Sequence, residues 1–172
     1  MTNKFIYCPS CKNKLNQKSN RLIDCPSCNF NFYINPALTN AVIFENKKQE
    51  ILLVKRKGEP FTGFWDLPGG FVEYNESCEE STIREIEEEL KIKIKNIKYF
   101  CSLPDIYPYK GFDYHTLCFF YTYKLSVEQE KDLKYSDDIS GFKFFKKDEI
   151  PYAKLAFRGL EKAIRFYLNE EK

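Results

Sequence analysis

The 172-residue sequence lacks any long apolar run. A membrane-spanning helix needs about 18 or more consecutive apolar residues, and no such stretch occurs. The opening residues, MTNKFIYCPSC, also lack the apolar segment of a secretory signal. Internal repeats and low-complexity tracts are absent too. We therefore expect a cytoplasmic protein with no membrane partner.

An excess of charge of one sign is also missing. The 27 basic and 25 acidic residues leave a net charge of +2, which makes a nucleic-acid partner unlikely on charge alone. Residues 1–33 are more basic, and a solvated surface is a simpler explanation for this than a phosphate contact. Their charged side chains are Lys4, Lys12, Lys14, Lys18, Arg21 and Asp24.

Seven cysteines are present, an odd number that argues against a disulfide framework. Four of them form two C-P-S-C pairs, a spacing typical of turns that hold one tetrahedral Zn²⁺. A redox pair or reduced thiols are the alternatives. Four thiolates leave no open position, so the zinc would be structural. The two pairs are Cys8 with Cys11 and Cys25 with Cys28, whereas Cys78, Cys101 and Cys118 are expected in the core.

The rest of the chain alternates strand-like and helix-like segments. Apolar patterns predict strands at 41–44, 50–56, 92–102, 114–125 and 140–150. Helices are predicted at 77–90 and 157–172, and 58–70 is rich in Gly and Pro and predicts a loop. This pattern favours an α/β sandwich at 35–172, preceded by a small four-cysteine zinc ribbon at 1–34.

The predicted helix at 77–90 is unusually acidic. Residues 69–90 contain eight glutamates and one basic residue, Arg84. Glu85, Glu88 and Glu89 share one side of the helix, in its second half, where the helix dipole disfavours anions. A bound Mg²⁺ or Mn²⁺ would offset this repulsion, and a solvated acidic face is the alternative.

The segment from residue 70 resembles the Nudix box, G-x5-E-x7-R-E-U-x-E-E-x-G-U, where U is a bulky apolar residue. Lys91 departs from the pattern, because it stands where the family has a glycine that ends the helix in a left-handed conformation. That departure concerns helix termination and none of the ligands. The matching positions are Gly70, Glu76, Arg84, Glu85, Ile86, Glu88, Glu89 and Ile92.

The resemblance implies an α/β/α sandwich with a mixed sheet and Mg²⁺-dependent (or Mn²⁺-dependent) hydrolysis of a nucleoside diphosphate linked to another group. It implies metal ligands at Glu85, Glu88, Glu89 and the Gly70 carbonyl. Glu85 could also act as the base toward water. Arg84 would orient Glu85, and Glu76 would hold Arg84 or a second metal ion.

A four-cysteine ribbon before the box resembles NADH pyrophosphatases and related Nudix proteins. Those enzymes carry S-Q-P-W-P-F-P beyond the box, and residues 102–108 read SLPDIYP. The match is partial, since Asp105 stands at the Trp position. Shorter proteins of this kind act on ADP-ribose or FAD, so ADP-ribose, NADH and FAD-like molecules are all expected substrates. The resemblance also suggests a homodimer.

A second departure concerns a further metal-binding glutamate that the family often has before its last strand. Gly141 occupies that position here, and Asp137 or Asp138 could replace the glutamate or lie in a solvated turn. The number of bound metals therefore stays open. His115, the only histidine, is expected to be structural.

Substrate contacts are expected from aromatic residues after the box. Tyr107, Tyr109 and Phe112 fall in the stretch where substrate-reading loops would lie, and core packing is their alternative role. Lys55 and Arg56 could contact phosphate, and a solvent-exposed strand end is their alternative role. A nucleotide-sensing or RNA-binding module, or an enzyme that processes RNA ends, is the alternative to a pyrophosphatase.

Overall fold

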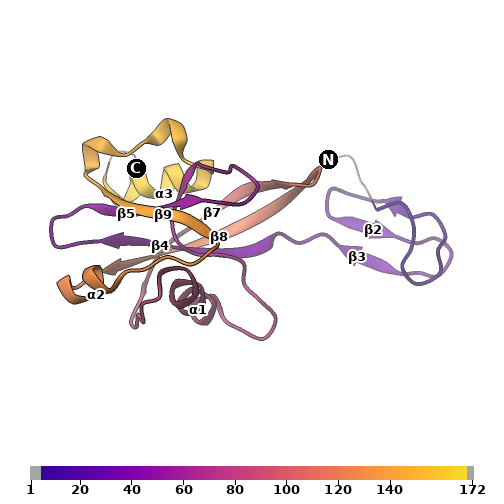
Figure 1. The fold of residues 1–172 in the computed structure, drawn as a ribbon. Helices are drawn as coiled ribbons and strands as arrows, with labels where there is room; N and C mark the ends of the chain where they lie inside the picture. The colour runs from indigo at the N-terminus through magenta and orange to yellow at the C-terminus, as the bar shows by residue number, and fades with distance from the viewer. Residues whose placement is uncertain (1–4, 170–172) are drawn as a thin grey trace. The chain divides into compact units, whose positions relative to one another are not determined.

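A computed structural model describes residues 5–169 as two compact units, one ending at Pro36 and the other beginning at Ala37 (Figure 1). Among residues 5–169, no helix is long and apolar enough to cross a membrane.

The first unit is a small antiparallel sheet of β1 (Asn16–Gln17), β2 (Leu22–Asp24) and β3 (Asn31–Tyr33). Both C-P-S-C segments form the same turn. The amide of Lys12 donates to the Cys8 carbonyl (2.9 Å), and that of Asn29 donates to the Cys25 carbonyl (3.0 Å). Lys12 and Asn29 both adopt a left-handed conformation, with φ of 62° and 58°. The sequence therefore builds one turn twice, and the turns bring the four cysteines together.

The second unit is built on a mixed six-stranded sheet with the order β6-β5-β4-β8-β7, in which β9 also pairs with β5. The pair β4 and β8 is parallel, and the other pairs are antiparallel. The strands are β4 (Ala37–Glu45), β5 (Ile51–Arg56), β6 (Trp65–Asp66), β7 (Lys98–Tyr109), β8 (Phe112–Lys124) and β9 (Ile139–Phe145).

Helices cover both faces of this sheet, as the sandwich prediction requires (Figure 1). Side chains alternate along each central strand, so Ile43 and Leu53 join one core and Phe44 and Leu52 join the other. The first core includes α3 (Arg158–Tyr167), and the second includes α1 (Cys78–Leu90). The remaining helical turns are α2 (Val127–Asp132), η1 (Lys147–Glu149) and η2 (Tyr152–Lys154).

Local sequence explains the start and end of α1. Ser77 is its N-cap, and Glu80 completes a capping box, so two helix-end amides find acceptors. Lys91 ends the helix with φ of 59°, the left-handed conformation that the family glycine would supply. A lysine in that conformation costs roughly 1 kcal/mol relative to glycine.

Several predicted bounds were wrong in detail. The strand predicted at 41–44 begins at Ala37, and the loop predicted at 58–70 contains β6. The helix predicted at 157–172 ends at Tyr167, and residues 170–172 lie outside the described part of the chain.

The strand expected at 92–102 begins only at Lys98, because Ile92 and Ile94 bury their side chains in the core beside α1 without joining the sheet. The stretch expected to hold loops after the box is instead a long hairpin of β7 and β8, closed by Lys110 and Gly111. The helix α2 was not predicted, although Ser126 and Gln129 form a capping box at its start.

Candidate active site

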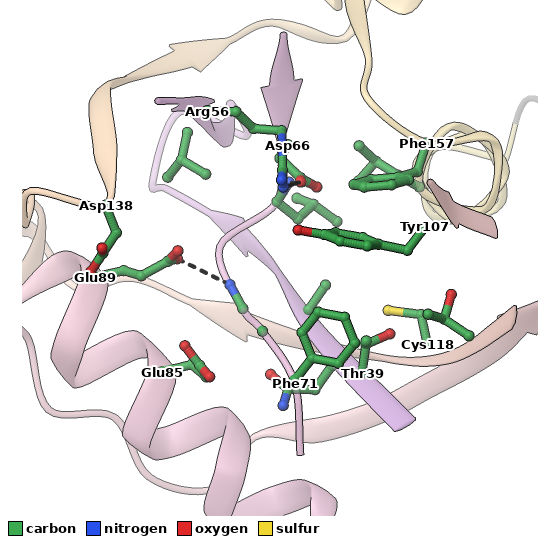
Figure 2. A pocket seen from close by; sticks show the side chains of 18 of the residues that line it. Thr39, Arg56, Asp66, Phe71, Glu85, Glu89, Tyr107, Cys118, Asp138 and Phe157 are labelled. Atoms are coloured by element: carbon green, nitrogen blue, oxygen red, sulfur yellow. Dashed lines mark hydrogen bonds and ion pairs between the residues drawn. The ribbon is translucent and has the colours of Figure 1, made fainter. Parts of the chain in front are cut away.

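A cavity of about 520 Å³ lies within the second unit. Its walls come from β4, β5, β7 and β8, from the segment around Gly69, and from α1 and α3 (Figure 2). One end is rich in carboxylates and the other in aromatic rings. Segments far apart in the sequence thus meet around one space.

The carboxylate end is formed by Glu85 and Glu89 of α1 and the glycines that face them. Glu89 Oε2 accepts a hydrogen bond from the Gly69 amide at 3.1 Å. A Cβ atom at Gly70 would lie 2.4 Å from the Glu85 carboxylate, so a larger residue there would force that carboxylate to move. The Gly70 carbonyl accepts a hydrogen bond from the Asn40 amide at 2.9 Å. The second lone pair of that carbonyl oxygen could bind a cation.

Burial and like charges make ionisation of these carboxyl groups unfavourable. Burial raises the pKa of Glu89 to about 8, and the charges of Asp66, Glu85 and Asp138 act in the same direction. Burial also raises the pKa of Glu85, although Arg84 opposes it. A cation bound here would offset that repulsion, and oxygen donors suit Mg²⁺ or Mn²⁺. The residues present therefore fit a hard divalent cation.

Arg84 organises the outer side of the helix. Its guanidinium contacts Glu76 at 2.7 Å, Glu85 at 3.0 Å and Glu88 at 3.3 Å, and it donates to the Phe71 carbonyl at 3.1 Å. Its hydrogen bonds lower the pKa of Glu76 to about 2. Arg84 and Glu76 do not line the cavity, and neither does Glu88, whose side chain is 58% exposed. Only Glu85 among these acidic partners reaches the cavity.

The opposite end is a wall of aromatic rings. Tyr107 and Phe157 are stacked, with centroids 5.8 Å apart and planes at 17°, and Phe71 meets Tyr107 edge-on at 5.2 Å (Figure 2). The Arg56 guanidinium lies over both stacked rings, 5.9 Å from Tyr107 and 5.3 Å from Phe157. Asp66 holds Arg56 through a 2.8 Å ion pair.

The structure brings some predicted residues into the cavity and leaves others outside it. Gly70, Glu85, Glu89, Arg56 and Tyr107 line it, as does Asp138, which lies near Glu89 in Figure 2. Four other residues considered from the sequence do not line the cavity. Tyr109 and Phe112 lie at the end of the β7–β8 hairpin, His115 is exposed on β8, and Asp137 lies beside Lys57. Gly141 lies in β9 with φ of +145°.

Sequence reasoning missed Asp66, Asp105 and Phe157. Asp66 lies four residues before Gly70, the first residue of the box, so its closeness in the sequence was a usable signal. Burial raises its pKa to about 6, against the opposing charge of Arg56. Phe157 carries no local signal, because only the packing of α3 brings it to the cavity.

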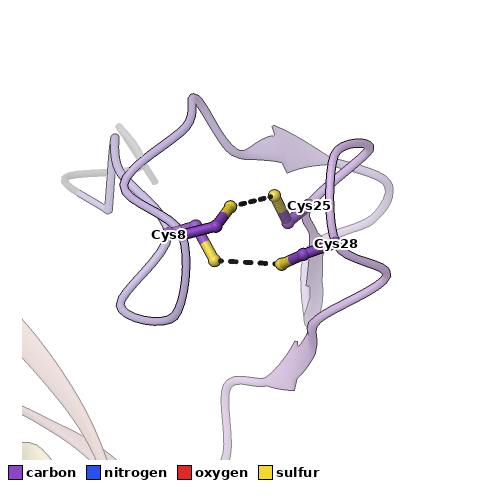
Figure 3. Close-up of side chains that lie close together, drawn as sticks. Cys8, Cys25 and Cys28 are labelled. Atoms are coloured by element: carbon purple, nitrogen blue, oxygen red, sulfur yellow. Dashed lines mark hydrogen bonds between the residues drawn. The ribbon is translucent and has the colours of Figure 1, made fainter.

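The four cysteines of the first unit form a second candidate site. Their sulfur atoms all lie within 4.8 Å of one another, with Cys8 to Cys28 at 3.6 Å and Cys11 to Cys25 at 3.4 Å (Figure 3). A Zn²⁺ ion with bonds of about 2.3 Å would place tetrahedral sulfurs about 3.8 Å apart. The cluster therefore has the size of a tetrahedral zinc site.

Sequence comparisons find relatives with named activities. An ADP-ribose pyrophosphatase of Methanocaldococcus jannaschii is 38% identical over 142 residues, which cover 81% of this chain and 78% of that protein. An NAD-capped RNA hydrolase NudC of Vibrio vulnificus is 31% identical over 109 residues. That match covers 63% of this chain but only 41% of the NudC protein.

Solved structures share the fold. A NUDIX hydrolase from Nitrosomonas europaea matches with a TM-score of 0.69 and 24% identity, over 96% of this chain and 91% of that one. The NUDIX domain of Shewanella oneidensis NrtR, solved with ADP ribose, matches with a TM-score of 0.64 and 22% identity, over 80% and 90% of the two chains. Residues 36–166 match the NUDIX domain, and because this match spans well over half of the chain, the protein belongs to the NUDIX family of hydrolases.

Proposed function

We propose that the protein hydrolyses the pyrophosphate bond of a nucleoside diphosphate linked to another group and releases a nucleoside monophosphate. ADP-ribose, NADH and FAD-like molecules are the substrate class. One observation carries the proposal: a single cavity has paired carboxylates at one end and stacked aromatic rings at the other. The first end suits a metal-bound pyrophosphate and the second a planar base. The relative named ADP-ribose pyrophosphatase supports the same class.

Glu85, Glu89 and the Gly70 carbonyl would hold Mg²⁺ or Mn²⁺ inside the cavity. Glu88 would contribute from the rim, where its exposed side chain already contacts Arg84. A bound divalent cation neutralises pyrophosphate charge, polarises phosphorus and lowers the pKa of water. Asp138, which also lines the cavity, is the candidate for the acidic ligand that Gly141 cannot provide.

Glu85 would accept the proton of the attacking water, because its carboxylate faces the cavity and burial raises its pKa. Arg84 would orient that carboxylate through the 3.0 Å contact. Glu76 would in turn hold Arg84, since it accepts from two nitrogen atoms of the guanidinium, at 3.1 Å and 2.7 Å. This chain of contacts would fix the base through residues that do not themselves line the cavity.

Tyr107 would stack on the base, and Arg56 would contact the phosphate or sugar. Arg56 is held in place by Asp66 and by the Pro60 carbonyl, which accepts from its Nε at 2.8 Å. Tyr109 and Phe112, farther along the hairpin, could contact only a substrate that extends beyond the cavity.

We also infer that the four-cysteine cluster holds a structural Zn²⁺. The twice-repeated turn and the sulfur spacing support this assignment. A unit of this size has little core of its own, so metal binding would supply much of its folding free energy.

Hydrolysis of NAD-capped RNA is a second candidate function. The similarity to proteins named NAD-capped RNA hydrolase NudC favours it, and so does the basic first unit. An RNA substrate would need the same carboxylates, so the two functions differ only in what extends from the cavity.

Chromatographic product analysis tests both functions. The protein with Mg²⁺ is incubated with ADP-ribose, NADH, NAD⁺, FAD, a nucleoside triphosphate and NAD-capped RNA, beside Glu89→Gln. AMP released from ADP-ribose or a dinucleotide by the wild type alone would support the proposal. Release from capped RNA alone would favour the second function. No turnover of any substrate by a folded, zinc-loaded protein would contradict both.

A further inference from the structure

Asp105 connects two segments that lie far apart in the sequence. It lies on β7, at the position where the partly matching motif has tryptophan, and its side chain lines the cavity. Asp105 Oδ2 accepts a hydrogen bond from the Gly159 amide at 2.6 Å, and Oδ1 accepts one from the Ile106 amide at 2.8 Å. Both carboxylate oxygens are therefore engaged within the protein.

The bond to Gly159 depends on a close approach of the backbone. A Cβ atom at Gly159 would lie 2.8 Å from Asp105 Oδ2 and 3.4 Å from the Pro104 carbonyl, so glycine lets α3 approach β7. Phe157, the N-cap residue of α3, provides no side-chain cap of its own. The Asp105 carboxylate supplies that cap from another strand, and its charge suits a helix N-terminus.

The capped helix end carries one of the two stacked rings. Phe157 directly precedes α3, and Tyr107 lies two residues after Asp105 on the same face of β7. The hydrogen bond of Asp105 therefore joins the two backbone segments whose rings stack at 5.8 Å. Arg56 contacts both rings, which requires that both segments keep this spacing.

We propose that Asp105 is a positioning residue: it docks α3 on β7, sets the Tyr107–Phe157 stack, and thereby determines how tightly the cavity binds the planar base of its substrate. This inference rests on the proposed function, since it names the element that selects the substrate at the same site. It assigns no contact between Asp105 and the substrate. Loss of the bond therefore weakens base binding and leaves the carboxylate end intact.

Four variants test the inference by steady-state kinetics with ADP-ribose: Asp105→Ala, Asp105→Asn, Phe157→Ala and the double variant Asp105→Ala/Phe157→Ala. Asp105→Ala should raise KM about five- to tenfold, which is the effect expected from one misplaced ring contact. Its kcat and its dependence on Mg²⁺ should stay within about twofold of the wild-type values. Asp105→Asn keeps an oxygen acceptor for Gly159, although it loses the acceptor for Ile106, and its KM stays within about twofold of wild type. The double variant is no worse than Phe157→Ala, because both changes remove the same contact.

Three results would overturn the inference. Additive effects in the double variant would mean that Asp105 acts independently of the ring. An Asp105→Asn variant as impaired as Asp105→Ala, but with wild-type thermal stability, would mean that the charge itself meets the substrate, because loss of the helix cap would also lower the stability. A lower kcat with unchanged KM would place Asp105 in the chemistry. If Asp105→Ala does not fold, Gly159→Ala crowds the same bond from the other side and gives the same rise in KM.

A binding measurement distinguishes failure of this inference from failure of the proposed function. If wild-type protein hydrolyses none of the substrates, calorimetric titration with AMP still reports base binding. Weaker AMP binding by Asp105→Ala, with near-normal binding by Asp105→Asn, would support the positioning role without turnover. Equal AMP binding by all variants, or none by the wild type, would overturn it.

Discussion

Replacing Glu89 with glutamine should stabilise the metal-free protein and abolish turnover. The wild-type carboxyl group is buried beside other acidic groups, and without a cation its pKa is about 8. Glutamine keeps an oxygen that can accept from the Gly69 amide but carries no charge. The substitution therefore removes an electrostatic cost of folding together with a metal ligand.

The magnitude follows from proton linkage. An unfolded glutamate has a pKa of 4.5, so at pH 7 it is ionised in the unfolded chain and largely protonated in the folded one. The unfolded pKa of 4.5 lies 2.5 units below pH 7, and this difference corresponds to about 3 kcal/mol, at about 1.4 kcal/mol per unit. For a chain of this length, that is roughly 6–12 °C in Tm.

The pH dependence of this stability effect also has a definite sign. A raised folded pKa gives stability that is fully present below pH 4.5 and is lost as the pH rises through about 8. Wild-type protein in chelator should therefore lose stability over this window, and Glu89→Gln should lose less. Adding Mg²⁺ should stabilise the wild type more than the variant, because the cation binds the ionised site.

Thermal unfolding in chelator at pH 5, 7 and 8.5, followed by addition of Mg²⁺, measures these effects. Glu88→Gln is the matched control, since its side chain is 58% exposed and its removal should change metal-free stability by less than about 0.5 kcal/mol. A Glu89→Gln variant that melts at or below the wild-type temperature at pH 7, or that keeps the wild-type pH slope, would refute the reasoning.

Three further predictions concern the other parts of the molecule. Cys25→Ser should release about one zinc ion per chain and expose residues 5–36 to protease while the second unit stays folded; metal analysis and limited proteolysis check this. Arg84→Lys should lower kcat about 10- to 100-fold, because a single ammonium cannot hold Glu76 and Glu85 together, and an unchanged kcat would contradict the assigned role. Tyr107→Ala should raise KM for ADP-ribose about five- to tenfold, whereas Phe112→Ala, a matched aromatic outside the cavity, should leave it nearly unchanged.

The acidic end of the site could be predicted from sequence because it is built from short-range structure. A capping box starts α1, helical periodicity sets which side chains share a face, and Gly70 is separated from the helix by a short loop. The prediction that Lys91 replaces a left-handed glycine agrees with its φ of 59°. Of the three glutamates predicted as ligands, Glu88 does not line the cavity, and its side chain contacts Arg84 at 3.3 Å.

The aromatic end could not be predicted, because it forms only when the whole sheet is assembled. Tyr107 was identified, but its partner Phe157 lies 50 residues later, beyond β8 and β9. Tyr109 and Phe112 were grouped with Tyr107 by sequence proximity. The hairpin register pairs Tyr109 with Phe112 at its end, outside the cavity, although the ring of Tyr109 still lies 6.3 Å from that of Tyr107.

The carboxylate end and the aromatic end depend on different segments, so they can vary independently. The carboxylate end is held by one helix and its loop, so most changes there alter ligands or the base and should affect kcat. The aromatic end depends on the docking of α3 against β7 through Asp105 and Gly159, and neither residue is part of the box. Changes at that contact can alter which substrate is bound while Glu85 and Glu89 stay in place. A substitution as small as Gly159→Ala should therefore change the selectivity of the enzyme before it changes its chemistry.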